Sequence, residues 1–375
     1  QVLITTYGLI RQDQEKYLAM NFEVIAIDEA QTIKNAEAQM TKILKQLKAV
    51  CKFALTGTPL ENSVLELWSI FDFILPGYLT RLSDFQKKYL IKEVNERSLS
   101  ILEQLKIQIR PFLLRRKKEE VVKELPPKIE NNISIDLNKE QKKLYGAFLE
   151  KAKKEMEEII ETEGFKKGNF KILQLLTRLR QICIDPQLVF KDYQGKSAKI
   201  EQLIDITKGI IENGHKILLF TSFKSALEIV EKEFSKNHIS TYVIDGSVSA
   251  KKRMELVTQF NQDATNVFLI TLKAGGTGLN LTSADVVIHL DLWWNPQVEN
   301  QATDRAHRIG QTKTVEVIKL ICKGTIEERI LELQTKKKIL SENLIEGKDC
   351  DQNIFSQLTE NEIKALLTLD QESLS

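Results

Sequence analysis

The sequence predicts an α/β protein built from two parallel-sheet lobes, the first incomplete, with a helical insertion between them. Short apolar runs alternate with helical segments at the beginning of the chain, and the same rhythm returns near residue 196. The stretch between them has helical periodicity. The 375 residues, 42% of them hydrophobic and 28% charged, are enough for two globular domains.

The bulk composition excludes some classes of protein and leaves others open. No apolar stretch approaches the ~18 residues that a membrane helix needs, so we expect no membrane contact. The net charge of +2 balances 54 basic against 52 acidic residues and argues neither for nor against nucleic acid. The four cysteines stand far apart, which predicts free thiols in a reducing compartment and no structural zinc.

Residues 1–110 are predicted to form the remainder of the first lobe with a helical protrusion. Strand-like runs and a helix at residues 36–47 alternate in the βαβ order of a doubly wound sheet, whose strands we expect to be buried. The expected strands are residues 2–6, 22–27 and 53–56. Residues 63–109 have a helical pattern with an apolar face, formed by Leu67, Ile70, Phe71 and Ile74.

Residues 111–195 are predicted to form a hinge and a helical insertion. The stretch at residues 110–127 contains a basic run (residues 115–118) and a Pro-Pro pair, which cannot continue a helix. A long helix is expected over residues 138–163. A second helix follows, with a buried stripe formed by Leu173, Leu176, Leu179 and Ile182.

Residues 196–325 are predicted to form the second lobe, and residues 326–375 a C-terminal helix with a polar tail. Helical segments separate most of the expected strands, which again indicates βαβ units. The expected strands are residues 216–221, 241–244, 267–271, 285–290 and 314–321. The helix after Thr325 is expected to run to about Leu344, and one more short helix is expected in the tail.

Two adjacent carboxylates, Asp28 and Glu29, follow the apolar run at residues 22–27. A buried parallel strand would deliver them to the carboxyl edge of the sheet, where open α/β sheets bind ligands. Phosphoryl transfer needs a divalent metal and a group that orients the attacking water. An Asp at the strand end suits the metal and the adjacent Glu suits the water. An arbitrary Asp-Glu pair would be solvated, but the position after a strand favours a catalytic role.

Hydroxyl side chains follow the next predicted strand. Thr56 and Thr58 flank a glycine on a tight turn, where they could sense the metal or a terminal phosphate. Alone, Thr-Gly-Thr-Pro predicts only a turn. The carboxylates upstream make it informative.

The second half of the chain offers partners for phosphate. Arg305 and Arg308 have helical spacing, which predicts a shared helix face, and guanidinium groups suit a transferring phosphoryl group. Surface ion pairing is the alternative. The glycine-rich loop at residues 274–281 could hold phosphates of a nucleotide or a nucleic acid through its N–H groups. Trp293 and Trp294 predict either lobe packing or stacking on nucleic acid.

The phosphate-binding loop of a nucleotide triphosphatase is the part that these residues do not supply. No Gly-x-x-x-x-Gly-Lys-Ser/Thr sequence occurs in the 375 residues, and the chain begins at Gln1 without an initiator Met. We therefore expect a fragment of an ATPase motor. Alone, it is expected to bind ATP poorly and to hydrolyse almost none.

These motifs together resemble helicase superfamily two, and more narrowly the Swi/Snf family of ATP-driven DNA translocases. The resemblance covers roughly residues 1–345, and the last motif is the most specific. Its motifs are Asp28-Glu-Ala-Gln31, Thr56-Gly-Thr-Pro-Leu-Glu-Asn62, Gly275-Gly-Thr-Gly-Leu-Asn280, Trp294-Asn-Pro296 and residues 301–311.

The resemblance implies two RecA-like lobes that close on ATP and Mg²⁺, with double-stranded DNA bound across both. Asp28 would hold the metal and Glu29 the hydrolytic water, while Arg305 and Arg308 would act as arginine fingers. The other implied roles are coupling by Gln31, Thr56, Thr58 and Gln301, phosphate binding by Gly276 and Gly278, and DNA contact by Phe220, Ser222, Thr277, Asn280 and Trp294.

Gln31 departs from the resemblance, because many relatives carry His there, which puts a contact between lobes by this side chain in doubt. Two other functions stay open: a strand-separating helicase and a non-catalytic DNA-binding scaffold. The implied partners are double-stranded DNA and, for the parent protein, a DNA-bound complex such as a polymerase. We expect a monomer in the bacterial cytoplasm, associated with the nucleoid.

Overall fold

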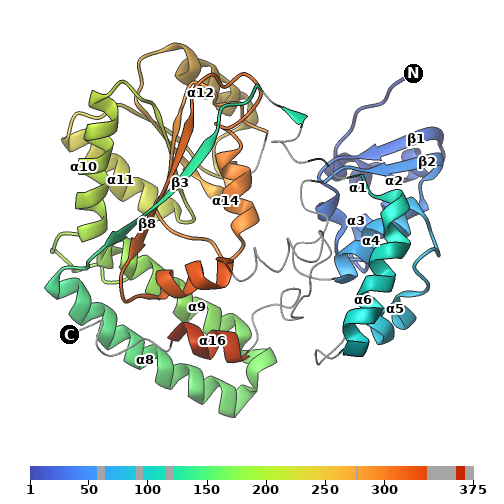
Figure 1. Cartoon of the computed structure of the whole chain (residues 1–375), viewed down its shortest axis with the longest axis horizontal. Coiled ribbons are helices and arrows are strands. Elements are labelled where there is room, and N and C mark those ends of the chain that lie inside the picture. The colour runs from blue at the N-terminus through green and yellow to red at the C-terminus, as the bar shows by residue number, and fades with distance from the viewer. Residues whose placement is uncertain are drawn as a thin grey trace. The chain divides into compact units, whose positions relative to one another are not determined.

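The structure, a computed structural model, describes residues 1–56, 64–89, 96–114, 116, 121–122, 124–275, 278–335 and 360–367. The chain divides between Arg115 and Arg116 into two compact units (Figure 1). The first unit contains the described residues up to Leu114, and the second contains the described residues from Arg116 onward.

The first unit contains a two-stranded parallel sheet with helices packed beside it. Strand β1 (Asn21–Ile27) pairs with β2 (Lys48–Ala54), and the pairing ends at Ile27 opposite Ala54. Ile33, Leu44 and Phe73 are fully buried in the adjoining core. The helical segments up to β2 are α1 (Tyr7–Gln12), α2 (Gln14–Leu18), η1 (Ala30–Ile33) and α3 (Gln39–Gln46).

Two sequence predictions for this unit are wrong. Residues 2–6 form no strand, because Thr6 caps α1 by accepting a hydrogen bond from the backbone N–H of Leu9 and the described strands of this unit pair with one another. The strands are also not buried. Val24 is 55% exposed and Phe53 is 54% exposed. The described strands of this unit form a two-stranded sheet, which is too small to bury the side chains of both strands.

The helical pattern predicted for residues 63–109 is confirmed where these residues are described. Leu67, Ile70 and Phe71 of the predicted apolar face are buried, and Ile74 is half-buried. Leu67, Phe71 and Ile74 pack with residues such as Phe85 and Leu105 from the following helices, whereas Ile70 packs into the core beside the sheet. The helical segments are α4 (Val64–Ile74), α5 (Leu82–Tyr89), α6 (Glu96–Ile109) and η2 (Arg110–Phe112).

The second unit is built on a six-stranded parallel sheet with strand order β3-β8-β7-β4-β6-β5. Side chains of β4 alternate between its faces. Ile217 and Leu219 pack under one set of helices, whereas Leu218 and Phe220 pack under another. The strands are β3 (Lys128–Ile135), β4 (Ile217–Thr221), β5 (Thr241–Ile244), β6 (Val267–Thr271), β7 (Val286–His289) and β8 (Val315–Cys322).

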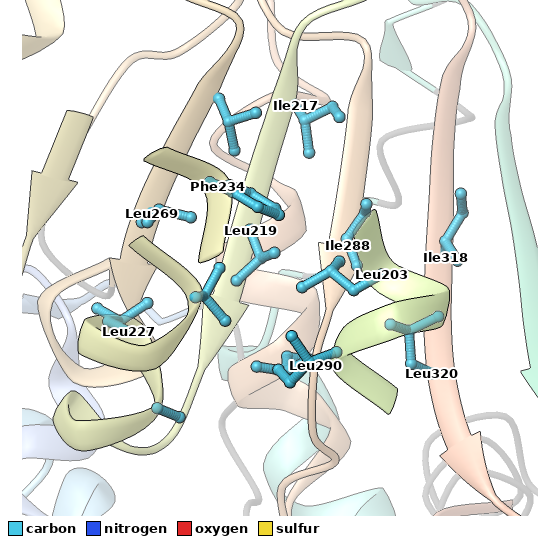
Figure 2. Packing of buried hydrophobic residues seen from close by; sticks show 14 of the residues in the cluster. Leu203, Ile217, Leu219, Leu227, Phe234, Leu269, Ile288, Leu290, Ile318 and Leu320 are labelled. Carbon is cyan, nitrogen blue, oxygen red and sulfur yellow. The ribbon is translucent and has the colours of Figure 1, made fainter. Parts of the chain in front are cut away.

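Helices cover both faces of this sheet. Figure 2 shows the first face, where Leu203 from α10 and Leu227 from α11 meet strand residues such as Leu219. On the other face Phe260 from α12 and Ala302 from α14 complete a separate core. The helices are α10 (Ala198–Glu212), α11 (Lys224–Lys236), α12 (Ala250–Gln262), α13 (Leu272–Gly275) and α14 (Pro296–Thr303).

All five strands predicted for the second lobe are confirmed, each within one residue of its predicted ends. The sequence did not predict strand β3, because most of its residues are polar and it contains neither an apolar run nor a regular alternation. It lies at the edge of the sheet and pairs with β8 over its full length, from Lys128 opposite Val315 to Ile135 opposite Cys322. The sheet of the second unit therefore begins before the helical insertion.

The insertion consists of α8 (Lys139–Glu163) and α9 (Phe165–Ile184), as predicted. Asn138 caps α8 by accepting a hydrogen bond from the Gln141 backbone N–H. Residues 326–335 are helical and α16 (Glu360–Leu367) is a further short helix, so both C-terminal helices are confirmed where they are described. The predicted continuation to Leu344 lies outside the described residues. None of the helices in the described part of the chain is long and apolar enough to cross a membrane.

Candidate functional site

Asp28 and Glu29 lie where the ends of β1 and β2 meet. The backbone N–H of Leu55 donates to Ile27 O (2.8 Å), and the N–H of Ala30 donates to Leu55 O (2.9 Å). These bonds extend the pairing beyond β1 and fix the position of both acids. Both side chains are exposed at the carboxyl end of the strand, as predicted.

Glu29 adopts a left-handed backbone conformation, with φ 49° and ψ 53°. This left-handed region is uncommon for a residue other than glycine, because the Cβ atom crowds the backbone, and such outliers cluster at functional sites. The Glu29 N–H donates to Asp28 Oδ1 (2.9 Å), which stabilises the turn locally. The two carboxylates therefore lie in a bend between β1 and η1, outside regular secondary structure.

A chain of hydrogen bonds connects Glu29 to the segment after β2. The Gln31 amide donates from Nε2 to Glu29 Oε2 (2.6 Å), and its Oε1 accepts from the Thr56 hydroxyl (2.7 Å). A side-chain amide can serve both neighbours because it carries a donor and an acceptor. The structure thus brings Glu29, Gln31 and Thr56 together. Thr58 lies outside the described residues.

Tyr7 is a site residue that the sequence did not reveal. Its hydroxyl donates to Asp28 O (2.6 Å). Burial, followed by the nearby carboxylates of Asp28 and Glu29, raises the pKa of Tyr7 to about 12, so the hydroxyl keeps its proton at neutral pH. No local sequence pattern indicates this contact, because Tyr7 and Asp28 are 21 residues apart.

Asp28 fits a magnesium ligand. One carboxylate oxygen accepts the Glu29 N–H, and the other makes no hydrogen bond to any residue that the structure describes. Mg²⁺ takes hard oxygen ligands, usually one or two carboxylates together with substrate phosphates and waters. An exposed carboxylate with one oxygen available meets that requirement.

Arg305 and Arg308 do not share a helix face, contrary to the sequence prediction. Helix α14 ends at Thr303, and both arginines lie in the turns that follow. Beyond these turns, Gln311 Nε2 donates to Ala284 O (2.8 Å) and to the carbonyls of Thr282 and Ala306, so it ties the segment after α14 to residues 282–284. Arg305 is half-buried and Arg308 is exposed.

The glycine-rich loop is described in part. Gly276 and Thr277 lie outside the described residues. Gly278 has a φ of 20°, and Asn280 is exposed with its carbonyl accepting from Asn261 Nδ2 (2.9 Å). The Leu281 N–H donates to Arg305 O (3.0 Å), which holds the end of this loop beside the arginine turn. Gln301 lies on α14 and is half-buried.

Phe220 cannot face DNA as the sequence analysis expected. Its side chain is fully buried, since β4 is a central strand covered on both faces. The ring stacks on His289 with 5.8 Å between ring centroids, and it fills the space beside Gly275. Ser222 is half-buried just beyond the strand. Of this pair, only Ser222 is placed to reach a ligand.

Arg180 on α9 is a buried residue that the sequence did not reveal. Its Nη2 donates to Asp291 Oδ2 (2.7 Å), Leu292 O (2.7 Å) and Ser222 Oγ (3.0 Å). The guanidinium also lies over the rings of Trp293 and Trp294. In the sequence, Arg180 is a charged residue on an amphipathic helix, in which exposed and buried positions are close together. No local pattern therefore predicts that its side chain is buried.

Two further buried networks hold the loops around this edge. Glu299 Oε1 accepts from the Trp293 N–H (2.7 Å) and from Gln334 Nε2 (2.6 Å), so it connects the tryptophan segment with the C-terminal helical residues. Lys199 donates to both carboxylate oxygens of Glu327 at 2.6 Å, and both side chains are fully buried. These networks position the site without reaching its surface.

A parallel sheet covered by helices on both faces, with polar loops at its carboxyl edge, defines a doubly wound α/β protein. The profile of the SNF2-related domain matches residues 1–188, and that of the helicase conserved C-terminal domain matches residues 198–310. The chain therefore belongs to the SNF2-related family.

Similar proteins agree with this membership. An uncharacterized ATP-dependent helicase of Mycoplasma pneumoniae is 42% identical over 98% of this chain and 34% of its own length. The putative ATP-dependent helicase/translocase YwqA of Bacillus subtilis is 40% identical over 98% of this chain and 40% of its own length. The chain thus spans between 34% and 40% of these relatives.

A solved structure has the same fold. The SWI2/SNF2 ATPase core of Sulfolobus solfataricus in complex with double-stranded DNA is 34% identical, with a TM-score of 0.53. The match covers 98% of this chain and 77% of that chain. Together with the family profiles, this confirms the predicted α/β class of the two units.

Proposed function

We propose that this chain is part of a motor that couples ATP hydrolysis to movement along double-stranded DNA. The observation that carries the proposal is the hydrogen-bonded connection from Glu29 through Gln31 to Thr56. It joins a carboxylate at the end of β1 to a hydroxyl at the end of β2. Relatives named as ATP-dependent helicases and translocases, and a related core bound to double-stranded DNA, support the same function.

In the first unit, Asp28 would hold Mg²⁺, and Glu29 would orient the water that attacks the terminal phosphate of ATP. The metal, when bound, supplies charge neutralisation on the phosphates. Glu29 is exposed and anchored by Gln31, so its carboxylate can accept a proton from water without leaving its position. Gln31 and Thr56, with Thr58, transmit the state of the nucleotide to the rest of the unit.

In the second unit, Arg305 and Arg308 neutralise charge on the transferring phosphoryl group. Guanidinium groups suit this role because they neutralise phosphate charge and donate several hydrogen bonds at once, as arginine fingers do. Gln301 on the preceding helix supports their approach. Gly276 and Gly278 offer backbone N–H groups to phosphate.

Contact with DNA is assigned to the loops at the carboxyl edge of the second sheet. Ser222 and Asn280 offer polar groups to the phosphate backbone, and the half-buried ring of Trp294 offers an apolar surface to the groove. Thr277 is included from the sequence. We propose that the parent protein acts as a monomer on nucleoid DNA in the bacterial cytoplasm and remodels complexes such as a DNA-bound polymerase.

A triplex-displacement assay tests the proposed movement. The protein that contains this chain, supplied with ATP and Mg²⁺, is expected to displace a third strand from duplex DNA while leaving the duplex intact. Separation of the duplex strands would show a strand-separating helicase instead. Failure to displace the third strand, with normal duplex binding, would contradict translocation.

The isolated chain is expected to hydrolyse almost no ATP, because its sequence contains no Gly-x-x-x-x-Gly-Lys-Ser/Thr loop to bind the triphosphate. Robust hydrolysis stimulated by duplex DNA in the 375-residue chain would contradict this expectation.

A further inference from the structure

Arg180 occupies a cage that polar groups and aromatic rings share. Its side chain is 1% exposed, and its Nη2 makes all three of its hydrogen bonds, to Asp291, Leu292 and Ser222. Its guanidinium carbon lies 5.1 Å from the ring centroids of both Phe223 and Trp293, and 5.3 Å from that of Trp294. These distances are within the range of cation–π attraction.

The cage joins three segments that are distant in the sequence. Arg180 comes from the insertion helix α9, Ser222 follows β4, and Asp291 lies in the segment that follows β7. Asp291 Oδ1 also accepts from the Thr221 hydroxyl (2.5 Å) and the Ser222 N–H (2.9 Å). The Arg180–Asp291 pair therefore fixes the loops at the carboxyl ends of two neighbouring strands relative to α9.

A buried charge needs a reason at this position. Replacement of a buried ion pair by apolar residues is often neutral for stability, so a pair of this kind is weak evidence for a role in folding alone. Arg180 instead contacts Ser222 and Trp294, two residues to which DNA contact is assigned. Its planar, rigid fork can stack and donate at once, which the flexible ammonium of a lysine cannot.

We propose that Arg180 is a positioning residue for the DNA-contacting surface: it presets the ring of Trp294 and the hydroxyl of Ser222 for duplex binding. This inference rests on the proposed function of these two residues. Arg180 itself touches no DNA, because its side chain is almost fully covered. It acts through its hydrogen bond to Ser222 and its contact with the Trp294 ring.

The test uses the 375-residue chain with Trp68→Phe, which leaves Trp293 and Trp294 as its tryptophans. Three further variants are compared: Arg180→Lys, Arg180→Met combined with Asp291→Asn, and Arg178→Met as control. The double substitution avoids an uncompensated buried carboxylate, and Asn keeps an acceptor for Ser222. Arg178 is exposed on the same helix, two residues away.

Three properties are measured for each variant. Duplex affinity is determined over a range of salt concentrations, the change in tryptophan emission on binding is recorded, and a thermal melt reports folding. The double variant is expected to fold cooperatively, to bind duplex about tenfold more weakly, and to lose the emission change. Arg180→Lys is expected to bind about threefold more weakly, because it keeps the charge but not the stacking. The control should keep the full emission change.

The salt dependence separates positioning from direct contact. Loss of one phosphate contact would reduce the slope of log affinity against log salt by about 0.9. A positioning residue leaves that slope unchanged, and a slope reduced by this amount would overturn the proposal. Unchanged affinity and emission in Arg180→Lys and in the double variant would also overturn it. Absence of duplex binding by the Trp68→Phe chain itself would refute the proposed function on which it rests.

Discussion

Removal of the buried charge of Lys199 is expected to destabilise the second unit more than any change at its surface. Lys199 Nζ donates to Leu290 O (2.9 Å), Leu320 O (3.0 Å) and both oxygens of Glu327 (2.6 Å). Lys199→Met leaves the carboxylate of Glu327 buried without its counterion. Breaking such a pair destabilises a protein by about 3–5 kcal/mol, a large part of the roughly 5–15 kcal/mol that keeps a domain folded.

The free energy of unfolding is measured by urea titration, with the emission of Trp293 and Trp294 reporting on the second unit in a Trp68→Phe background. Lys208→Met is the control, because Lys208 is exposed on the same helix and should change stability by no more than about 0.5 kcal/mol. Lys199→Met with Glu327→Gln is expected to recover at least about 2 kcal/mol, since no charge is then buried alone. A decrease of less than about 1 kcal/mol in the free energy of unfolding of Lys199→Met would contradict a stabilising role of Lys199 as the counterion of Glu327.

Three further changes test other parts of the account. Gln31→Ala removes the hydrogen bonds that connect Gln31 to Glu29 and to Thr56. In the complete protein it should reduce the stimulation of ATP hydrolysis by duplex DNA more than it reduces basal hydrolysis. Equal losses of the two rates, measured by phosphate release, would argue against coupling. Arg308→Ala in the complete protein should abolish turnover and leave duplex affinity nearly unchanged, and near-normal turnover would remove the arginine-finger assignment. Burial lowers the pKa of His289 to about 3, so the unfolded chain binds its proton first, and the stability of the second unit should fall as the pH decreases from about 6.5 towards 3; His289→Phe, followed by urea titration, should weaken this dependence, and an identical pH profile would contradict it.

Much of the fold of the second unit could be predicted from sequence because its central strands β7, β4 and β6 are short, mostly apolar runs. Strands β4 and β6 are buried at every position, and such runs leave little choice of structure. The polar edge strand β3 could not be found in this way, because its position depends on pairing with β8, more than 180 residues away. In the first unit, the run at residues 2–6 has strand-like composition but no described strand beside it.

The site was predictable where a motif places its residues locally, as for Asp28 and Glu29 at the end of β1. It was not predictable where distant side chains determine the geometry. Arg305 and Arg308 have helical spacing in sequence, yet α14 ends at Thr303, and Gln311 holds the segment that follows through a hydrogen bond to Ala284 O, 27 residues away. Phe220 follows the pattern of a DNA-contacting motif, yet a central strand buries it. Tyr7 and Arg180 have partners 21 and 111 residues away, which no local pattern reveals.

The proposal that Glu29 orients water for ATP hydrolysis coupled to duplex DNA is tested with the complete protein. Duplex-stimulated ATP hydrolysis is measured with and without Glu29→Gln. The substitution keeps the size of the side chain and its contact with Gln31 but removes the base that orients water. We expect the rate of ATP hydrolysis to rise with duplex DNA and to fall by about 100-fold or more in the variant, while duplex binding persists. Hydrolysis that duplex DNA does not stimulate, or that survives Glu29→Gln at a near-normal rate, would contradict it.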